Sequence, residues 1–467
     1  MGVASFLKLK KMTNVSPKHH ITAMQLLYAS KHKIRIEHKA MSNVLAKQSS
    51  KLERYSDAFK FYFKQDQKQK SSQPTSELSD LVRPRLKIAL VTETWPPEIN
   101  GVARSLLQLC KGLQELGHKI LLIRPEQKQA CTQFQPYQEC LVKAQAIPKY
   151  HNLQFGWPQW SKLSQALDEF QPDVVHIVTE GPLGLASLHI AKSKNIPVSS
   201  GFHSAFQDFS RFFDLAFLLK PIQHYLKWFH NNTSLTCVPS SHTEKSLRQF
   251  GVQGPLVVVG RGVNVEYFSP DFRSTQLRAS WGASENTRVM LYVGRLSPEK
   301  EVNLIINAYQ RMPKNTEQPV KLVIVGDGPD RERLEAMNAQ GDIIFTGSLS
   351  GTALAQAYAS ADVFAFASQV ETFGNVVLEA MASGLPVIAY DYACARLHLK
   401  PNETGWLSPL GQPEDLVGHI HRLPDLTTLR QMGEHARKAT LNIGWQYPVQ
   451  QFEQALYLVA KELHMPS

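Results

Sequence analysis

The chain has 467 residues, of which 43% are apolar and 19% are charged, so it has the composition of a globular protein of about two to three domains. Its formal net charge of +11 lies in the first 86 residues, which hold 17 of the 51 Lys and Arg but only 6 of the 40 Asp and Glu. The basic character therefore belongs to a leader, and the charges of the remaining chain balance.

We expect residues 1–82 to form this leader, disordered or partly helical, because residues 63–78 are polar and poor in apolar side chains. A basic leader can touch anionic lipid or nucleic acid. A solvated tail, or a start codon placed too early with Met41 as the alternative start, explains the segment more simply.

Cysteine use and hydropathy indicate the compartment. The five cysteines are scattered, with no C-x-x-C pair, which favours reduced thiols and argues against a disulfide framework or a zinc site. No apolar run reaches the ~18 residues of a transmembrane helix, and the N-terminus has no long apolar core of a signal peptide. We therefore expect a cytoplasmic protein.

From residue 86 onwards, short apolar strands alternate with helices. Residues 86–92 predict a buried strand, residues 104–117 a helix, and residues 119–125 the next strand. Residues 173–179, 196–203 and 235–240 continue the series. This alternation predicts a parallel sheet covered by helices on both faces.

The same alternation restarts after residues 262–271. Further strands are predicted at residues 288–294, 321–326, 342–347, 362–368 and 386–391. We therefore predict an α/β fold with two Rossmann-like domains, at residues 83–262 and 263–442. Residues 443–467 are expected to form an amphipathic helix that packs back on the N-terminal domain.

Ligands of such sheets bind beyond the carboxyl ends of the strands, so residues just after strands are the candidates. Five of them follow predicted strands: Gly101, His203, Arg295, Gly326 and Glu371.

The strongest of these signals is the sequence ETFGNVVLEAMASGLP at residues 371–386. Glu371 lies on a loop, Gly374 and Asn375 follow, and Glu379 lies about one turn inside the next helix. The free N–H groups at that helix N-terminus favour an anion. The arrangement suits a nucleotide-sugar, with its diphosphate on the amides and a glutamate for the hydroxyls on each side.

The sequence GRLSPEK, directly after a strand, supplies Arg295 and Lys300. A forked guanidinium and a compact ammonium suit a diphosphate and would stabilise it as a leaving group. A surface loop that happens to carry two cations is an equally good interpretation of this motif alone.

Three motifs are weaker. Gly101 allows close approach of a ligand, although a plain turn between strand and helix is the simpler interpretation. His203 could hydrogen-bond a sugar hydroxyl or shield developing positive charge, but a lone histidine is more often structural. The turn at Gly326 is predicted to be mainly structural, with a contact to the donor as the alternative. Asp330 is expected to cap or charge the start of the next helix.

Residues 211–230 combine aromatic and aliphatic side chains with Arg211, Lys220 and Lys227. Such a stripe is more often buried in a core, and its alternative is a basic amphipathic surface at a bilayer interface.

Taken together, these motifs resemble the retaining glycosyltransferases of family 4, which have the GT-B fold of two Rossmann-like domains facing across a cleft. The resemblance covers residues 86–465 and rests on NGV (100–102), VGRLSPEK, GDGP, FTG (345–347) and the E-x7-E block. RGVNVEYFSP at residues 261–270 is similar to the branch of GDP-mannose-dependent α-mannosyltransferases and sulfolipid synthases, with Asn264 in place of the usual Asp.

The resemblance implies a role for each matching residue. Arg295 and Lys300 would hold the donor diphosphate, Glu379 the ribose, and Glu371 the hydroxyls of the sugar, as a binding residue and not a nucleophile. His203 would lie beside the donor sugar. The remaining donor-binding positions implied are Gly101, Gly326, Phe345, Gly347, Phe373, Gly374 and Asn375.

The resemblance also implies transfer with retention of configuration, with no cofactor and no metal. The expected donor is GDP-mannose, followed by UDP-glucose or another UDP-hexose. The expected acceptor is a lipid or lipid-linked glycan at the inner face of the membrane, with peripheral membrane contact and no specific nucleic acid. A soluble enzyme that makes a small glycoside, and a non-catalytic nucleotide-sugar binding protein, are the alternatives.

One segment departs from the family pattern. Family members often carry a glycine-rich segment with an acidic residue after the strand at residues 386–391, where this chain reads YDYACARLHLKPNETGWL. The contacts of residues 391–400, including those that select the sugar, are therefore open.

Overall fold

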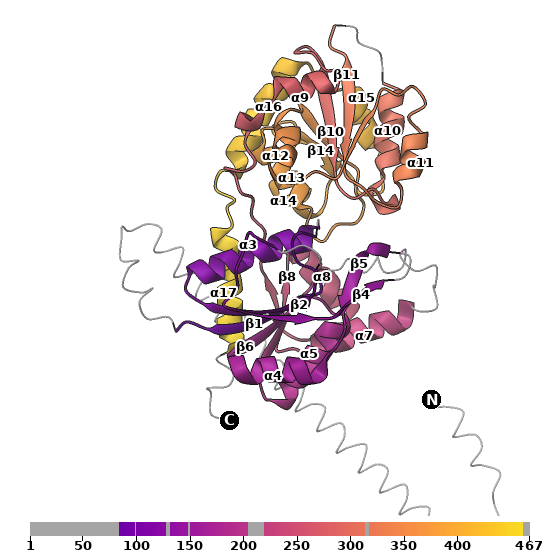
Figure 1. Ribbon diagram of the computed structural model, residues 1–467. Coiled ribbons are helices and arrows are strands. Elements are labelled where there is room, and N and C mark those ends of the chain that lie inside the picture. Colours follow the sequence, from indigo (N-terminus) through magenta and orange to yellow (C-terminus); the bar gives the residue numbers. More distant parts are fainter. Residues whose placement is uncertain are drawn as a thin grey trace, which may run out of the picture. The chain divides into compact units, whose positions relative to one another are not determined.

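The structure is a computed structural model that describes residues 84–98, 100–127, 131–147, 150–203, 219–312 and 317–460. Contacts divide the chain into two units, Met1–Leu81 and Val82–Ser467. The predicted leader lies outside the described residues. The second unit contains two parallel sheets, which gives the predicted α/β architecture (Figure 1).

The first sheet has seven strands in the order β3-β2-β1-β6-β7-β8-β9, and each neighbouring pair is parallel. Its central strands are runs of aliphatic residues buried on both faces, as helix-covered parallel sheets require. An antiparallel hairpin follows β3 along the chain. The strands are β1 (Lys87–Val91), β2 (Lys119–Pro125), β3 (Gln138–Val142), β4 (Ala144–Ile147), β5 (Tyr150–Gly156), β6 (Val174–Ile177), β7 (Val198–Gly201), β8 (Leu235–Val238) and β9 (Leu256–Val258).

Helices cover both faces of this sheet, with α4 and α5 on the face opposite α3 and α17 (Figure 1). Helix α3 begins where the Asn100 side chain accepts the Ala103 N–H at 2.7 Å, a side-chain cap that satisfies one of the first N–H groups. The helices are α3 (Gly101–Glu115), α4 (Trp160–Phe170), α5 (Pro182–Ser193), α7 (Leu219–Asn231), α8 (Ser241–Phe250) and α17 (Gln446–Ala460).

The second sheet has six parallel strands in the order β12-β11-β10-β13-β14-β15. Its strands are β10 (Arg288–Val293), β11 (Val320–Val325), β12 (Ile344–Gly347), β13 (Val363–Phe366), β14 (Val387–Tyr390) and β15 (Gly405–Ser408). Its helices are η3 (Pro270–Phe272), α9 (Thr275–Ser280), η4 (Pro298–Lys300), α10 (Val302–Gln310), α11 (Arg331–Ala336), α12 (Gly351–Ala359), α13 (Asn375–Ala382), α14 (Ala393–His398), α15 (Pro413–His421) and α16 (Leu426–Thr440).

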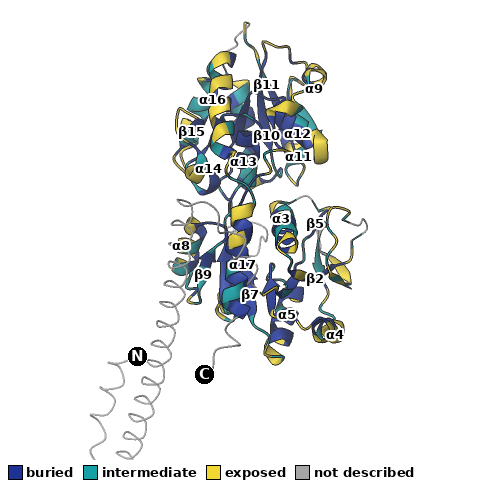
Figure 2. Cartoon of the chain, turned by 90° about the vertical axis from the view of Figure 1, so that its left-hand side faces the viewer, coloured by how far each residue is buried: buried dark blue, intermediate teal, exposed yellow. Residues whose placement is uncertain are grey.

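Each sheet forms the centre of a hydrophobic core, and its central strands are among the most buried parts of the described chain (Figure 2). All six side chains of β10 are buried. Burying one large aliphatic side chain contributes about 1.5–3 kcal/mol, so the central strands are a main source of stability.

The chain passes from the first sheet to the second and back again. The outward and return connections run side by side, because the Val263 N–H donates to the Ile443 carbonyl at 2.9 Å. Gly262 leaves no space for a side chain there, since a Cβ would lie 2.6 Å from the Gly444 backbone. Helix α17 then packs against α3, β6, β7 and β8.

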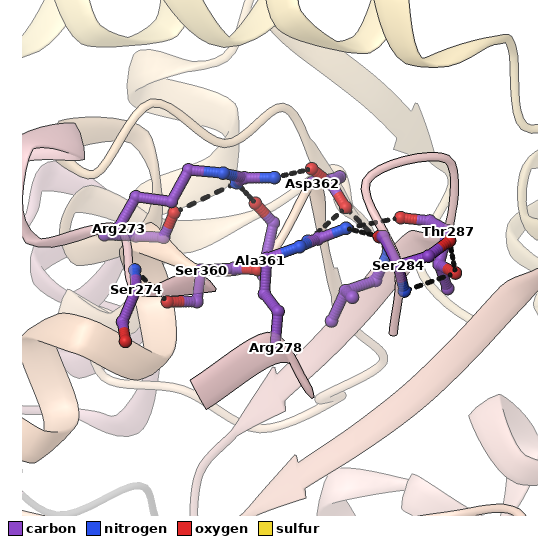
Figure 3. A network of polar contacts seen from close by, with 10 residues as sticks. Arg273, Ser274, Arg278, Ser284, Thr287, Ser360, Ala361 and Asp362 are labelled. Atoms are coloured by element: carbon purple, nitrogen blue, oxygen red, sulfur yellow. Dashed lines mark hydrogen bonds and ion pairs between the residues drawn. The ribbon is translucent and has the colours of Figure 1, made fainter. Parts of the chain in front are cut away.

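A buried ion-pair cluster joins the start of the second domain to the amino edge of its sheet (Figure 3). Asp362, directly before β13, binds Arg273 at 2.8 Å and Arg278 at 2.9 Å. It also accepts the Val289 N–H at 2.8 Å, and Arg278 donates to the Thr287 carbonyl at 2.6 Å. We call these residues the Asp362 cluster.

The structure confirms the predicted strands of both series and the terminal helix as far as residue 460. The prediction missed β3, β9, β15 and the β4–β5 hairpin. Of the two roles predicted for Asp330, capping is wrong, because its side chain makes no capping hydrogen bond at the start of α11 and instead binds Arg333 of that helix at 2.9 Å. Its charge does lie at that helix start, as the other role requires. The exact domain limits stay predictions.

The stripe at residues 211–230 is described only from Leu219, where α7 begins. Leu226 and Phe229 are buried in this part of it, which fits the core interpretation, whereas Trp228 is 43% exposed. Within the described ranges, every helix is too short or too polar to traverse a bilayer.

Candidate active site

The candidate residues of the second domain gather at the carboxyl edge of its sheet. Arg295 and Lys300 follow β10, Gly326 follows β11, and Glu371 follows β13. Because β11, β10 and β13 are neighbours in the sheet, their loops emerge side by side.

Lys300 and Glu371 form a partly buried ion pair, with the Lys300 Nζ 2.7 Å from Glu371 Oε1 and side chains 14% and 17% exposed. The same ammonium donates to the Val370 carbonyl at 3.0 Å and lies 3.3 Å from Ser368 Oγ. Ser368 in turn donates to Glu371 Oε1 at 3.0 Å. The carboxylate is therefore held by two neighbours on two loops, Lys300 and Ser368, and Lys300 is itself anchored by the Val370 carbonyl.

Two contacts with backbone carbonyls hold the start of the loop that carries Arg295. The Arg295 carbonyl accepts the hydroxyl of buried Tyr292 at 2.9 Å. Gly326 has a φ of +147°, and a Cβ on it would lie 1.8 Å from the Gly294 carbonyl oxygen. Only glycine fits this approach, so packing of β11 against the loop after β10 is sufficient to explain Gly326.

Phe345 and Gly347 lie on the edge strand β12 and are half-buried. The Gly347 carbonyl accepts the Gly326 N–H at 2.9 Å, which brings these two predicted donor-binding positions together.

Helix α13 begins at the glycine of the E-x7-E block. Gly374 has a φ of +90°, the left-handed conformation that glycine adopts without strain. Phe373 is only 5% exposed, so only its backbone is left to meet a ligand. Asn375 donates from Nδ2 to Ser105 Oγ of α3 at 2.9 Å, while its buried Oδ1 has no hydrogen-bond partner.

Glu379 lies on α13 and is 8% exposed. It accepts the Tyr358 hydroxyl at 3.0 Å and lies 3.6 Å from the Arg104 guanidinium of α3. Burial raises its pKa, while Arg104 and the Tyr358 hydrogen bond act in the opposite direction. A buried carboxylate with few partners is well placed to accept hydrogen bonds from ligand hydroxyls.

In the first domain, Gly101 is exposed at the start of α3, and a Cβ on it would have nothing within 4 Å. His203 follows β7, and its Nδ1 lies 3.0 Å from Arg261 Nη2. Because arginine only donates, this contact makes Nδ1 an acceptor and puts the proton on Nε2. Burial and the Arg261 charge hold the pKa of His203 well below its usual range, so the ring is neutral at physiological pH.

His203 belongs to a small pocket within the first domain, where His176 and Arg261 also lie. In the second domain, the predicted residues Lys300 and Glu371 are in contact at the carboxyl edge of the sheet. The structure thus presents the predicted residues as two groups, one from each sheet.

Sequence reasoning missed Arg104, Ser105, Ser368 and Tyr358. The position of Arg104, one turn after Gly101 on the same helix, was the available signal. Tyr358 lies on α12, far from any motif, and its contact with Glu379 needed the fold.

Comparison with known proteins supports the resemblance to family 4 glycosyltransferases. A Glycosyltransferase Family 4 model matches residues 99–267, and a "Glycosyl transferases group 1" model matches residues 273–439. The GDP-mannose-dependent alpha-mannosyltransferase of Mycobacterium tuberculosis is 33% identical over 370 residues, which cover 77% of this chain and 93% of that protein. The chain belongs to glycosyltransferase family 4.

Two further relatives of this family 4 glycosyltransferase are named for different activities. Sulfoquinovosyl transferase SQD2 of Arabidopsis thaliana is 29% identical over 82% of this chain and 75% of that protein. An alpha-monoglucosyldiacylglycerol synthase of Streptococcus pneumoniae is 28% identical over 65% of this chain and 71% of that protein.

The fold is GT-B, as expected. Sucrose-phosphate synthase of Thermosynechococcus elongatus superposes with a TM-score of 0.65 at 21% identity, over 80% of this chain and 99% of that one. The family models and the named relatives, rather than this superposition, show that the family 4 member is a hexosyltransferase that acts on nucleotide sugars.

Proposed function

We propose that this enzyme transfers mannose from GDP-mannose to a lipid or lipid-linked glycan, with retention of anomeric configuration. The observation that carries the proposal is the Lys300–Glu371 pair at the carboxyl edge of the second sheet, at 2.7 Å. In this proposal Lys300 is the cation that meets the departing diphosphate, and the adjacent Glu371 carboxylate binds the sugar's hydroxyls.

The leaving group is stabilised by fixed charge. Lys300 is held by Val370 and Glu371, so it needs little reorganisation when negative charge develops on the diphosphate. Arg295, on the same loop, adds a guanidinium. The N-terminus of α13 contributes its N–H groups and the positive end of its dipole.

Glu371 acts as a binding residue. Its Oε1 accepts hydrogen bonds from both Lys300 and Ser368, which lowers its reactivity as a nucleophile. Transfer then proceeds on one face of the sugar: the bond from the anomeric carbon to the diphosphate breaks, the acceptor oxygen bonds to that carbon, and the acceptor proton goes to the departing phosphate. His203 donates from Nε2 to the sugar, and no metal takes part.

The donor nucleoside binds on the second sheet. Glu379 accepts the ribose hydroxyls, and Arg104 approaches this carboxylate from α3. Phe345 and Gly347 lie beside the base. Gly101, with open space in front of it, and the backbone of residues 373–375 approach the diphosphate.

The choice of sugar and acceptor rests on the relatives. The mycobacterial relative supports GDP-mannose, and the diacylglycerol-glucosylating relative supports a lipid acceptor. We place the enzyme in the cytoplasm at the inner face of the membrane, as a peripheral protein.

The test uses the full-length protein with GDP-mannose, UDP-glucose and UDP-galactose. The donor should raise the melting temperature and label a lipid extract, and NMR of the product should show an α-linkage. Glu371→Gln is the inactive control. Labelling by a UDP-hexose alone would overturn the choice of mannose, and binding without transfer to any acceptor would make the chain a nucleotide-sugar binding protein.

A second experiment, vesicle co-sedimentation, distinguishes an enzyme that binds the membrane from a soluble enzyme. We expect co-sedimentation with vesicles that contain anionic lipid. Transfer to a small alcohol together with no sedimentation would favour an enzyme that makes a soluble glycoside.

A further inference from the structure

Residues 391–400, which follow β14, lie directly against the loop that carries Glu371. We call residues 368–374, between β13 and α13, the carboxylate loop. The Tyr392 hydroxyl donates to the Ser368 carbonyl at 2.9 Å, at the start of this loop. The Cys394 N–H donates to the Phe373 carbonyl at 2.8 Å, at its end. Two residues of one short segment thus hold both ends of the carboxylate loop.

The residue between them, Ala393, has a φ of +48°. This left-handed conformation costs a residue with a Cβ roughly 1–2 kcal/mol, and glycine avoids the cost. Strain of this kind persists only where surrounding contacts determine it, and the contacts here are those of Tyr392 and Cys394.

The segment also reaches the Lys300 side of the site. The Tyr390 hydroxyl donates to Glu301 Oε2 at 3.1 Å, and Gln369 of the carboxylate loop donates to Glu301 Oε1 at 2.6 Å. Glu301 directly follows Lys300. The end of β14 therefore contacts both loops that supply the ion pair.

We propose that Tyr392 is a positioning residue for Glu371. Its hydroxyl fixes the Ser368 backbone, and Ser368 Oγ then meets Glu371 Oε1 at 3.0 Å. The turn at Ala393 allows Tyr392 and Cys394 to hold the carboxylate loop at the same time. The inference rests on the proposed function, because it assigns Glu371 to the sugar part of the donor.

Tyr392→Phe tests the proposal, because it removes only the hydroxyl. We expect kcat/KM for GDP-mannose to fall about 3- to 10-fold, the effect of one ordinary hydrogen bond. The affinity for GDP, which lacks the sugar, should stay within about twofold by calorimetry. In a Glu371→Gln background, Tyr392→Phe should have no further effect on GDP-mannose affinity, as expected of coupled residues.

Tyr309→Phe is the matched control. Its hydroxyl donates to Asp342 at 3.0 Å on the other side of the same domain, and its loss should leave GDP-mannose kinetics unchanged. Ala393→Gly tests the turn: glycine accepts the same conformation, so transfer should stay within about twofold of wild type.

Three results would overturn the proposal: unchanged kinetics in Tyr392→Phe, equal losses of GDP and GDP-mannose affinity, or additive effects of Tyr392→Phe and Glu371→Gln on GDP-mannose affinity. Failure of the proposed function would look different, because the wild-type protein itself would then not transfer mannose from GDP-mannose.

Discussion

Two groups of charged side chains lie at opposite edges of the second sheet. The Asp362 cluster lies at the amino edge, and Lys300 pairs with Glu371 at the carboxyl edge. Both combine carboxylates with cations at 2.7–2.9 Å. They differ in what surrounds them: the Asp362 and Arg278 side chains are 2% and 4% exposed, whereas those of Lys300 and Glu371 are 14% and 17% exposed.

The partners differ as well. Both Asp362 oxygens are used by two guanidinium groups and a backbone N–H, and Arg278 also donates to three backbone carbonyls. Such a saturated cluster holds η3 and α9 to the sheet. The carboxyl-edge pair lies on loops, where a ligand of a parallel sheet binds. The same ionic chemistry therefore holds the fold together at one edge and, in the proposed function, binds the donor at the other.

The largest effect is expected for Asp362→Asn. It removes a buried charge and leaves Arg278 without its counterion, which should lower the free energy of unfolding by about 3–5 kcal/mol. Chemical denaturation measures the loss. The protein that remains folded should keep its kcat, and a large fall in kcat at full folding would show that the amino edge is coupled to the site.

Lys300→Ala should have the next largest effect, now on catalysis. Loss of one preorganised charge at the leaving group should reduce the transfer rate about 10²- to 10³-fold. Lys321→Ala is the control, since Lys321 donates to the Asp342 carbonyl at 3.0 Å on the opposite side of the domain. If the two variants lost activity equally, Lys300 would have no specific role in catalysis, and the proposed difference between the two edges would be wrong.

Glu93, in the first domain, offers a third kind of environment. It accepts the Leu183 N–H at 3.0 Å at the start of α5. Burial, and secondarily the nearby Glu180 charge, raise its pKa from 4.5 to about 7. Between these two values the folded state holds a proton that the unfolded state has lost, so the stability due to this group falls as the pH rises through that window and is constant above it.

Glu93→Gln should remove this dependence. The difference in unfolding free energy between pH 4.5 and 8 should be smaller in the variant than in wild type, by up to about 3 kcal/mol. Denaturation at both pH values measures it. The exposed carboxylate Glu169, in Glu169→Gln, is the control, and equal pH dependence of wild type and Glu93→Gln would contradict the assignment.

The smallest expected effect is none. If Lys300 and Arg295 supply the positive charge at the diphosphate, dialysis against EDTA should change the transfer rate by less than about twofold. Restoration of a lost rate by Mg²⁺ or Mn²⁺ would show that the cations at the carboxyl edge do not suffice.

The sequence predicted the parts of the fold that have local signals. Buried apolar runs identified the central strands, and Glu371 was correctly placed on a loop with Glu379 inside the next helix. Two edge strands were missed: β9 has only three residues, and β15, with the sequence GWLS, has only two apolar side chains between a glycine and a serine. The capping role predicted for Asp330 was wrong because Arg333, one turn away, competes for its carboxylate.

The site was predicted only in part, for a physical reason. Motifs mark residues that follow strands, but the partners of those residues come from elsewhere in the chain. Arg104 reaches Glu379 from another domain, and Tyr392 meets Ser368 across 24 residues. Such pairings depend on strand order and loop conformation, which no local pattern encodes.

The return of α17 to the first sheet has a practical consequence for measuring motion. The Tyr457 hydroxyl donates to the Pro84 carbonyl at 2.7 Å, so both ends of the described chain are anchored in one body. A fluorophore pair near these ends would report a constant separation whatever the second domain did. To measure a change in distance between the two domains, one fluorophore must lie between residues 275 and 440 and the other on α4 or α5.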